Sequence, residues 1–378
     1  MKILICSTGY NSINAENTIG IFQLDQAKAL RDIGHDVRIA SFDLRSIRRK
    51  RHFGAYLFEV DGIKAATANF PYGGLPFYII EEVIAEKCAK KTYEMITDDG
   101  WIPDIIHAHF CDVAAAFAGI SKKKGIPFVV TEHYSKLHRQ MVEKGILHAA
   151  QKAYKNADAL IAVSTSLANS VYKKTGYKFR IIHNIVDAEV FETKHGLKKD
   201  DCYTFISAGH LKPVKGMDIL IEAFSKLKEK NKRLIILGEG TERNKLEKLA
   251  RERACISQIE FRGEYKRSDF QNAMENADCF VLASRSETFG VVYIEAMAAG
   301  LPVIGTHCGG PDEFITEEVG LMVSVDDVEE LTQAMKYMIN YSEKFDKNKI
   351  SQYAKREFGK GVITEQIQAV YEEVIKNE

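Results

Sequence analysis

The chain has 378 residues, which is long enough for two domains with separate hydrophobic cores. Its 52 basic and 52 acidic residues balance, so the net charge gives no indication of a nucleic acid partner. The seven cysteines are scattered and form no C-x-x-C pair, which predicts reduced thiols and a cytoplasmic protein. We expect neither a signal peptide nor a membrane-spanning segment, because the apolar runs are too short for either.

Strands and helices alternate through the first half of the chain. Residues 2–7 form an apolar run of strand length, and a polar loop follows. Gly20 then opens a predicted helix that ends at Gly34, and the next strand is expected at 35–42. The order strand, helix, strand predicts a parallel sheet with helices on its faces. Ligands of such sheets bind at the carboxyl ends of the strands, so the loop before Gly20 is expected at the edge of a site.

A basic stretch follows the second predicted strand. Its charged residues are Arg45, Arg48, Arg49, Lys50 and Arg51, and apolar residues lie among them. One interpretation is a solvated connecting loop. The other is a surface that contacts an anionic membrane, to which each basic residue would contribute about 1 kcal/mol. The second interpretation predicts a peripheral protein on the inner face of the plasma membrane.

Three histidines lie at predicted strand ends in the first half of the chain. His107 and His109 alternate along one strand and therefore point to one face of the sheet, and His133 follows another strand. They could satisfy polar groups at the strand ends, bind a metal with Cys111 or Asp112, or contact a substrate. We favour contact with a substrate, because the carboxyl edge of a parallel sheet is where ligands bind. We rank the metal site last, because no acidic pair nearby completes it.

The second half of the chain repeats the pattern of the first. Residues 192–201 are charged and lack helical or strand periodicity, which predicts a linker between domains at 1–191 and 202–361. A last helix, at 362–378, has one apolar face. The strand and helix around Gly238 lack the third glycine of a dinucleotide fingerprint, so NAD is weakly supported.

Two helix starts in the second half are candidate anion sites. In HLKPVKG, residues 210–216, Lys215 lies beside the unpaired amides of a predicted helix start. The second helix is expected to begin near Phe289. Its unpaired amides are around Gly290, Val291 and Val292.

Two carboxylates flank the second of these helix starts. Glu287 lies just before the helix and Glu295 lies within it, eight positions further along. At helical rise they would be about 12 Å apart. That distance suits a diphosphate with a hydroxylated ring at each end.

These segments together resemble the retaining glycosyltransferases of family 4, the group 1 type of polysaccharide and glycolipid biosynthesis. GHLKPVKGMDILIEAF (209–224), LGEGTERNKLEKLA (237–250) and SETFGVVYIEAMAAGLPVI (286–304) are similar to the family's motifs in the family's order. The third segment contains the family's E-x7-E pair. The resemblance implies the α/β GT-B fold, with two Rossmann-like domains facing across a cleft and a C-terminal helix that crosses back to the first domain.

The resemblance also implies roles for individual residues. Glu295 would accept hydrogen bonds from the ribose hydroxyls of a nucleotide, and Glu287 would hold hydroxyls of the transferred sugar. Lys215 and the amides at 289–292 would neutralise the diphosphate. His109 would face the sugar, with Glu287 and Lys215 as the other catalytic residues. The donor site would also include Gly20, Gly238 and His210, and His210 stands where the family usually has arginine.

The implied activity is transfer of a hexosyl group from a nucleotide-diphosphate sugar, UDP- or GDP-linked, to a glycan or lipid-linked acceptor. We expect no obligatory metal, because a lysine and two helix starts supply the positive charge that stabilises the leaving diphosphate. We expect front-face transfer, by the family resemblance alone. The alternatives are a GT-B sugar-nucleotide epimerase or phosphorylase, a two-lobed binding protein without chemistry, and a metal hydrolase built on the three histidines.

Overall fold

The computed structural model describes residues 1–8, 20–44, 52–72, 78–138, 141–191 and 202–376. The chain divides into two compact units. Unit 1 comprises Met1–Ile185 and Lys360–Glu378, and unit 2 comprises Val186–Gly359. The predicted linker at 192–201 and the basic stretch at 45–51 lie outside the described residues.

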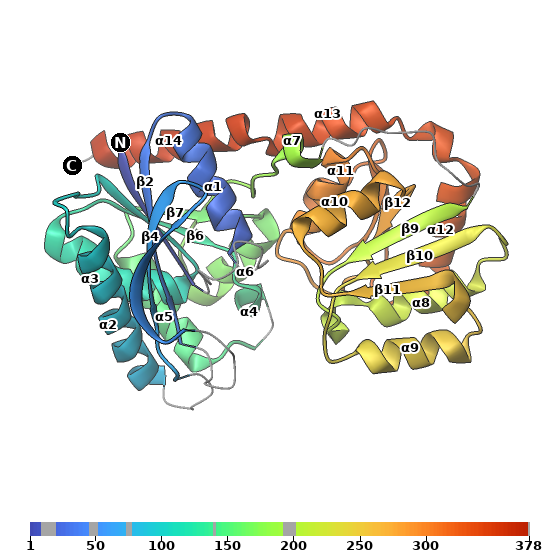
Figure 1. Cartoon of the computed structure of the whole chain (residues 1–378), viewed down its shortest axis with the longest axis horizontal. Helices are drawn as coiled ribbons and strands as arrows, with labels where there is room; N and C mark the ends of the chain where they lie inside the picture. Colours follow the sequence, from blue (N-terminus) through green and yellow to red (C-terminus); the bar gives the residue numbers. More distant parts are fainter. Residues whose placement is uncertain (9–19, 45–51, 73–77, 139–140, 192–201, 377–378) are drawn as a thin grey trace. The chain divides into compact units, whose positions relative to one another are not determined.

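Unit 1 is built on an eight-stranded sheet with the order β3-β4-β2-β1-β5-β6-β7-β8 (Figure 1). All neighbouring strands are parallel except β3 and β4, which form an antiparallel pair at one edge. The strands are β1 (Lys2–Thr8), β2 (Asp36–Asp43), β3 (Gly54–Val60), β4 (Ile63–Asn69), β5 (Ile105–His109), β6 (Phe128–Glu132), β7 (Ala159–Ala162) and β8 (Arg180–Ile181). The predicted parallel sheet is therefore confirmed, whereas the antiparallel edge pair was not predicted.

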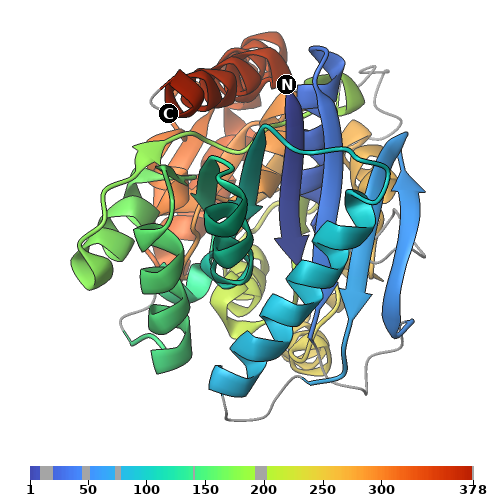
Figure 2. The same ribbon diagram turned by 90° about the vertical axis from the view of Figure 1, so that its left-hand side faces the viewer.

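Helices cover both faces of this sheet. They are α1 (Ile21–Asp32), α2 (Tyr78–Ile96), α3 (Cys111–Lys124), α4 (Ser135–His138), α5 (Lys144–Lys155), α6 (Thr165–Thr175) and α14 (Lys360–Lys376). Figure 2 shows α2 and α3 in front of the strands. Helices α1 and α14 pack on the opposite face, where their apolar side chains form the core with the strands.

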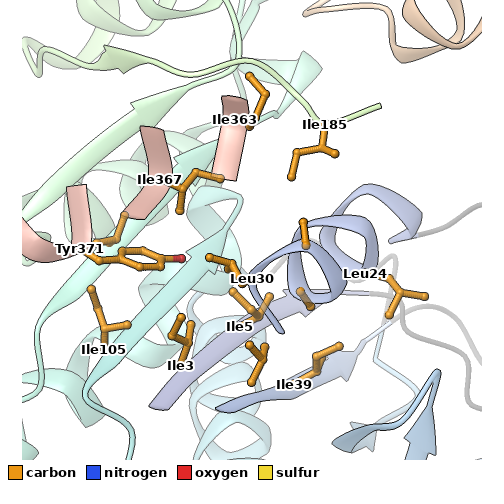
Figure 3. Packing of buried hydrophobic residues seen from close by; sticks show 14 of the residues in the cluster. Ile3, Ile5, Leu24, Leu30, Ile39, Ile105, Ile185, Ile363, Ile367 and Tyr371 are labelled. Carbon is orange, nitrogen blue, oxygen red and sulfur yellow. The ribbon is translucent and has the colours of Figure 1, made fainter. Parts of the chain in front are cut away.

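The returning helix α14 is part of the core of unit 1. Ile363, Ile367 and Tyr371 of α14 are at most 2% exposed, and they pack in one cluster with Ile5 and Leu30 (Figure 3). This apolar face is what the sequence predicts for a terminal amphipathic helix. The predicted return of the C-terminal helix to the first domain is thus confirmed.

The apolar layer of unit 1 gives way to a polar layer at the carboxyl edge of the sheet. Along β5, Ile105 belongs to the apolar cluster, and His107 and His109 continue the same face of the strand. On β6, Val129 belongs to the cluster and Thr131 continues its face. Both histidines are fully buried, although they lie at the carboxyl end of the strand.

Unit 2 is built on a six-stranded parallel sheet with the order β11-β10-β9-β12-β13-β14. The strands are β9 (Tyr203–Ala208), β10 (Lys232–Leu237), β11 (Ile259–Gly263), β12 (Cys279–Val281), β13 (Val303–Thr306) and β14 (Gly320–Val323). A second parallel sheet was predicted, and β14 was not.

Helices also cover both faces of the second sheet. They are α7 (Ala188–Phe191), α8 (Met217–Lys226), α9 (Arg243–Glu252), α10 (Arg267–Glu275), α11 (Val291–Ala298), α12 (Val328–Asn340) and α13 (Lys347–Phe358). Short 3-10 turns lie at η1 (Pro213–Lys215), η2 (Ile256–Gln258), η3 (Gly310–Glu313) and η4 (Ser342–Lys344). Helix α8 packs against α9 and α12, whereas α11 packs against α7 and α13.

All seven cysteines lie in the described part of the chain and are thiols, as predicted, and five of them are buried. None of the helices in the described ranges is long and apolar enough to cross a membrane.

Candidate active site

The loops at the carboxyl edge of the second sheet bring together residues that are far apart in sequence. Gly209 follows β9, Gly238 follows β10, and Ala283 follows β12. A Cβ atom on Gly238, which has φ 142°, would lie 1.9 Å from the carbonyl oxygen of Gly209. Glycine at 238 is therefore required for two neighbouring loops to approach each other, independently of any ligand. The predicted donor contact of Gly238 stays a prediction.

Lys215 and Glu287 meet at this edge as an ion pair. Lys215 Nζ donates to Glu287 Oε1 at 2.6 Å, and Ser284 Oγ donates to the same oxygen at 2.7 Å. The two side chains are 23% and 10% exposed, so water screens the pair only partly. Charge-assisted hydrogen bonds of this length are strong and hold both groups in place.

The backbone of Glu287 is held as firmly as its carboxylate. Its N–H donates to the carbonyl of Cys308 at 3.2 Å, and its carbonyl accepts from the N–H of Gly310 at 3.0 Å. The residue thus forms a single parallel bridge with the turn after β13. A ligand that meets Glu287 would find a carboxylate already fixed in position.

Helix α11 begins two residues later than the sequence predicts. Gly290 is its N-cap, with φ 97°, and the first helical residue is Val291 rather than Phe289. The ring of Phe289 is 1% exposed and packs against Phe314 and Phe358, which explains why this residue belongs to the turn and not to the helix. Only its backbone could take part in the predicted diphosphate site.

Glu295 lies within α11, as predicted, and is 7% exposed. Arg267, the first residue of α10, places Nη2 at 3.3 Å from Glu295 Oε1. Burial raises the pKa of the Tyr265 hydroxyl, and the charge of Glu295 raises it further. The predicted ribose carboxylate is therefore flanked by two side chains from the segment after β11, and the sequence analysis identified neither of them.

His210 stands beside the lysines of the β9–α8 loop. Partial desolvation lowers its pKa from the ordinary value of 6.5, and the charges of Lys212 and Lys215 lower it further. The imidazole is therefore neutral at pH 7. The family's usual arginine at position 210 would carry a permanent positive charge. With histidine there, Lys215 is the cation of the pair of positions 210 and 215.

The three histidines of unit 1 form a stack at the carboxyl edge of the first sheet. The rings of His107 and His109 lie 4.6 Å apart with an interplanar angle of 17°, and those of His109 and His133 lie 5.2 Å apart. His109 Nδ1 is 2.9 Å from His133 Nε2. His109 Nε2 is buried and has no hydrogen-bond partner among the described residues.

Both ring nitrogens of His107 are occupied. Nδ1 lies 2.6 Å from the Tyr371 hydroxyl and 3.1 Å from the Gln26 amide nitrogen, and Nε2 lies 2.6 Å from Thr131 Oγ1. These bonds match the interpretation in which a strand-end histidine satisfies polar groups. Of the two histidines on β5, only His109 has a ring nitrogen, Nε2, that could bind a ligand without losing a hydrogen bond to another described residue.

The metal interpretation of the histidines finds no site in the described part of the chain. No group of three or more His, Cys, Asp or Glu side chains there is placed to hold a metal ion. The further ligands that this interpretation needed lie in the first turn of α3, where Cys111 is buried and Asp112 accepts a hydrogen bond from the N–H of Val113.

Burial of the histidine stack predicts a loss of stability in acid. Burial lowers the pKa of His109 from 6.5 to about 3, so the folded chain stays neutral there while the unfolded chain binds a proton below pH 6.5. Because the unfolded state binds more protons, the free energy of unfolding falls as the pH is lowered from 7 to 5, by about 2 kcal/mol for this group.

Urea unfolding at pH 7 and pH 5, followed by the fluorescence of Trp101 in unit 1, measures this loss. His109→Gln should lose about 2 kcal/mol less between the two pH values than the wild type, whereas a variant of the exposed His52, His52→Gln, should match the wild type. The buried Glu132, whose pKa is raised to about 7, acts in the opposite direction, and the comparison between variants cancels its contribution. Equal losses in the wild type and His109→Gln would contradict the prediction.

Unit 2 thus holds the predicted donor-site residues other than Gly20, and it brings Lys215 and Glu287 into contact. Unit 1 holds His109 and Gly20, and Gly20 is the N-cap of α1, with φ 84°. The loop before Gly20 lies outside the described residues.

Solved structures with the same architecture are glycosyltransferases of the GT-B fold. Sucrose-phosphate synthase from Thermosynechococcus elongatus aligns over 100% of both chains, with a TM-score of 0.82 and 18% identity. HepE from Anabaena, in complex with UDP and glucose, aligns over 99% of this chain and 100% of its own, with a TM-score of 0.75 and 20% identity. The chain has the GT-B fold.

The family follows from the sequence matches. The model of Glycosyltransferase Family 4 matches residues 19–190, and the model of Glycosyl transferases group 1 matches residues 189–357. The two matches together span residues 19–357, and the chain belongs to the group 1 glycosyltransferases of family 4. The epimerase or phosphorylase alternative is not favoured.

Curated relatives are glycosyltransferases and synthases. N-acetyl-alpha-D-glucosaminyl L-malate synthase of Bacillus anthracis is 24% identical over 86% of this chain and 85% of its own length. The putative teichuronic acid biosynthesis glycosyltransferase TuaC of Bacillus subtilis is 25% identical over 89% of this chain and 88% of its own. The match to glycogen synthase of Mycobacterium tuberculosis spans 62% of that protein.

Proposed function

We propose that the protein is a retaining hexosyltransferase that uses a UDP- or GDP-sugar and an acceptor of envelope polysaccharide assembly. The observation that carries the proposal is the ion pair of Lys215 and Glu287, which lies at the carboxyl edge of the second sheet just before α11. A cation and a fixed carboxylate at that edge suit a ligand with a charged diphosphate and a hydroxylated ring.

The reaction places negative charge on the leaving diphosphate as its bond to the anomeric carbon breaks. Lys215 and the amides of the first turn of α11 stabilise that charge in place, without reorganisation during the reaction. Glu287 holds hydroxyls of the transferred sugar. Lys215 and Glu287 bind each other at 2.6 Å. When donor binds, Lys215 therefore exchanges a carboxylate for the diphosphate, and Glu287 exchanges an ammonium group for sugar hydroxyls.

Retention requires that the new bond forms on the face from which the diphosphate leaves. The acceptor oxygen attacks the anomeric carbon on that face, the carbon–phosphate oxygen bond breaks, and the departing phosphate takes the acceptor's proton. This front-face route needs no nucleophilic side chain. It needs no metal either, because Lys215 and the helix amides supply the positive charge.

A thermal-shift panel without metal tests the donor class. UDP, GDP, ADP and CDP are compared, and one of the first two should raise the melting temperature by several degrees, since a ligand at 100 times its Kd stabilises by about 2.7 kcal/mol. Glu295→Ala should lose this shift, because it removes the acceptor of the ribose hydroxyls. Glu260→Ala, on the exposed end of β11, should keep it.

Two results would count against the proposal. A chain that responds to none of the four nucleotides would not have the donor site, and activity abolished by EDTA would contradict the metal-free route. The UDP complexes of HepE support beginning the panel with UDP.

The name of the B. subtilis relative, a teichuronic acid biosynthesis enzyme, supports an envelope glycan as acceptor. A cytoplasmic protein on the inner face of the membrane would meet such an acceptor in its lipid-linked form. The basic residues at 45–51 would provide the contact with anionic lipid. Flotation with liposomes of phosphatidylglycerol at low salt should carry the protein upward, and protein that stays at the bottom would rule this contact out.

A further inference from the structure

Arg267 lies against the predicted ribose carboxylate but outside the three motif segments of the sequence analysis. It is the first residue of α10, and the segment from Gly263 to Lys266 connects it to β11. Its Nη2 atom is 3.3 Å from Glu295 Oε1 on α11. The two side chains are only 19% and 10% exposed. A pair this deeply buried is screened far less by salt and water than a surface ion pair.

A second contact places the Arg267 guanidinium over an aromatic ring. The guanidinium carbon lies 4.7 Å from the centre of the Phe191 ring, on α7. An aromatic face on one side and a carboxylate at the edge hold the guanidinium group in one orientation. Helices α7, α10 and α11 all belong to unit 2, so this arrangement is complete within one unit.

The arrangement allows the Glu295 carboxylate to bind Arg267 and a ligand at the same time. Arg267 reaches Oε1, whereas a ribose presents two neighbouring hydroxyl groups that donate hydrogen bonds. A carboxylate has about four acceptor positions on its two oxygens, so it can accept from a guanidinium and from a diol at the same time. The guanidinium contact also helps to hold the buried carboxylate in place, and a diol needs a fixed carboxylate for two hydrogen bonds of good geometry.

We propose that Arg267 is a positioning residue of the donor site, which orients the Glu295 carboxylate for the ribose hydroxyls of the nucleotide. The inference rests on the proposed function, in which Glu295 binds the ribose. It adds a residue that acts through Glu295 rather than on the ligand. Removing Arg267 takes this cation away from a buried carboxylate, and the ribose then meets a carboxylate that the guanidinium no longer holds in place.

The test compares nucleotide affinity by isothermal titration calorimetry with UDP, GDP and their 2′-deoxy forms. For the nucleotide that the wild type binds, Arg267→Gln should raise the Kd about 10-fold or more, and Arg267→Lys should recover part of the loss. The ratio of the Kd of the 2′-deoxy nucleotide to the Kd of the ribonucleotide should fall toward one in Arg267→Gln, because that ratio measures how much the 2′-hydroxyl contributes to binding. Arg262→Gln, a variant of an exposed arginine that pairs with Glu260, should match the wild type in both respects.

A double-mutant cycle separates positioning from direct contact. If Arg267 acts through Glu295, Arg267→Gln should change the Kd no further in the Glu295→Ala background. An equal loss in both backgrounds would overturn the inference, as would wild-type affinity in Arg267→Gln. If Arg267→Gln does not fold, as judged by circular dichroism, Arg267→Lys decides, and an unchanged deoxy-to-ribose ratio in that variant overturns the inference. A wild type that binds neither UDP nor GDP would overturn the proposed function itself, which is a different result.

Discussion

Lys215→Ala is expected to lower kcat/KM by a factor of about 10² to 10³. The loss should appear mainly in kcat, because the diphosphate carries most negative charge in the transition state, where Lys215 stabilises it. The magnitude is that of removing one well-placed donor from a site of developing charge. His210 does not compensate for the missing cation, because its imidazole is neutral at pH 7.

Lys212→Ala is the matched control for Lys215→Ala. Lys212 lies three residues earlier in the same loop and is exposed to solvent. Steady-state kinetics with the donor identified by the nucleotide panel should give a kcat/KM within about twofold of the wild type for this variant. Lys215→Ala that keeps more than a tenth of the wild-type kcat/KM would contradict the assigned role. Circular dichroism of each variant excludes unfolding as the cause.

The sequence predicts the parts of the donor site that lie in short contiguous motifs. Glu287 and Glu295 are eight residues apart on one turn and one helix, so their separation follows from local geometry alone. Lys215 was assigned to the same ligand because it, too, lies at a helix start after a strand. The structure adds that Lys215 and Glu287 are in direct contact, although 72 residues separate them in sequence.

Contacts between distant segments explain what the sequence did not reveal. Arg267 is one of 52 basic residues, and only the fold of unit 2 brings the start of α10 to Glu295 on α11. His107 and His109 look equivalent in IIHAHF, yet Tyr371 and Thr131 occupy the nitrogens of His107 and leave His109 Nε2 unpaired within the described residues. No periodicity in the chain carries this information.

The boundaries of α11 show how side-chain packing overrides local preference. The apolar residue at 289 extends the helical pattern by two residues, which places the predicted start too early. In the structure, Phe289 fills the core between Phe314 and Phe358, and Gly290 ends the turn with a positive φ. Similarly, the β3–β4 pair adds an antiparallel edge to a sheet whose other pairs are all parallel.

Gly216→Ala is expected to destabilise unit 2 by about 2 to 5 kcal/mol. Gly216 has φ 60°, where an L-residue costs about 1 to 2 kcal/mol, and a Cβ atom there would lie 1.8 Å from the carbonyl oxygen of Ala283. This oxygen belongs to the backbone, so the clash can be relieved only by moving one loop away from the other, at a further cost of about 1 to 3 kcal/mol. These are the loops after β9 and β12 that carry Lys215 and Glu287.

Urea unfolding followed by circular dichroism measures the loss, and Trp101 fluorescence identifies the transition of unit 1. Gly176→Ala is the control, because Gly176 has a similar φ of 78° but no atom within 4 Å of the position that its new methyl group would take. Gly176→Ala should therefore show only the conformational cost. Gly176 lies in unit 1, so each variant is compared with the wild type in its own unit. A loss in unit 2 for Gly216→Ala no larger than the loss in unit 1 for Gly176→Ala would contradict the close approach of the two loops. If the approach holds, Gly216→Ala should also weaken nucleotide binding, because separating the loops separates Lys215 from Glu287.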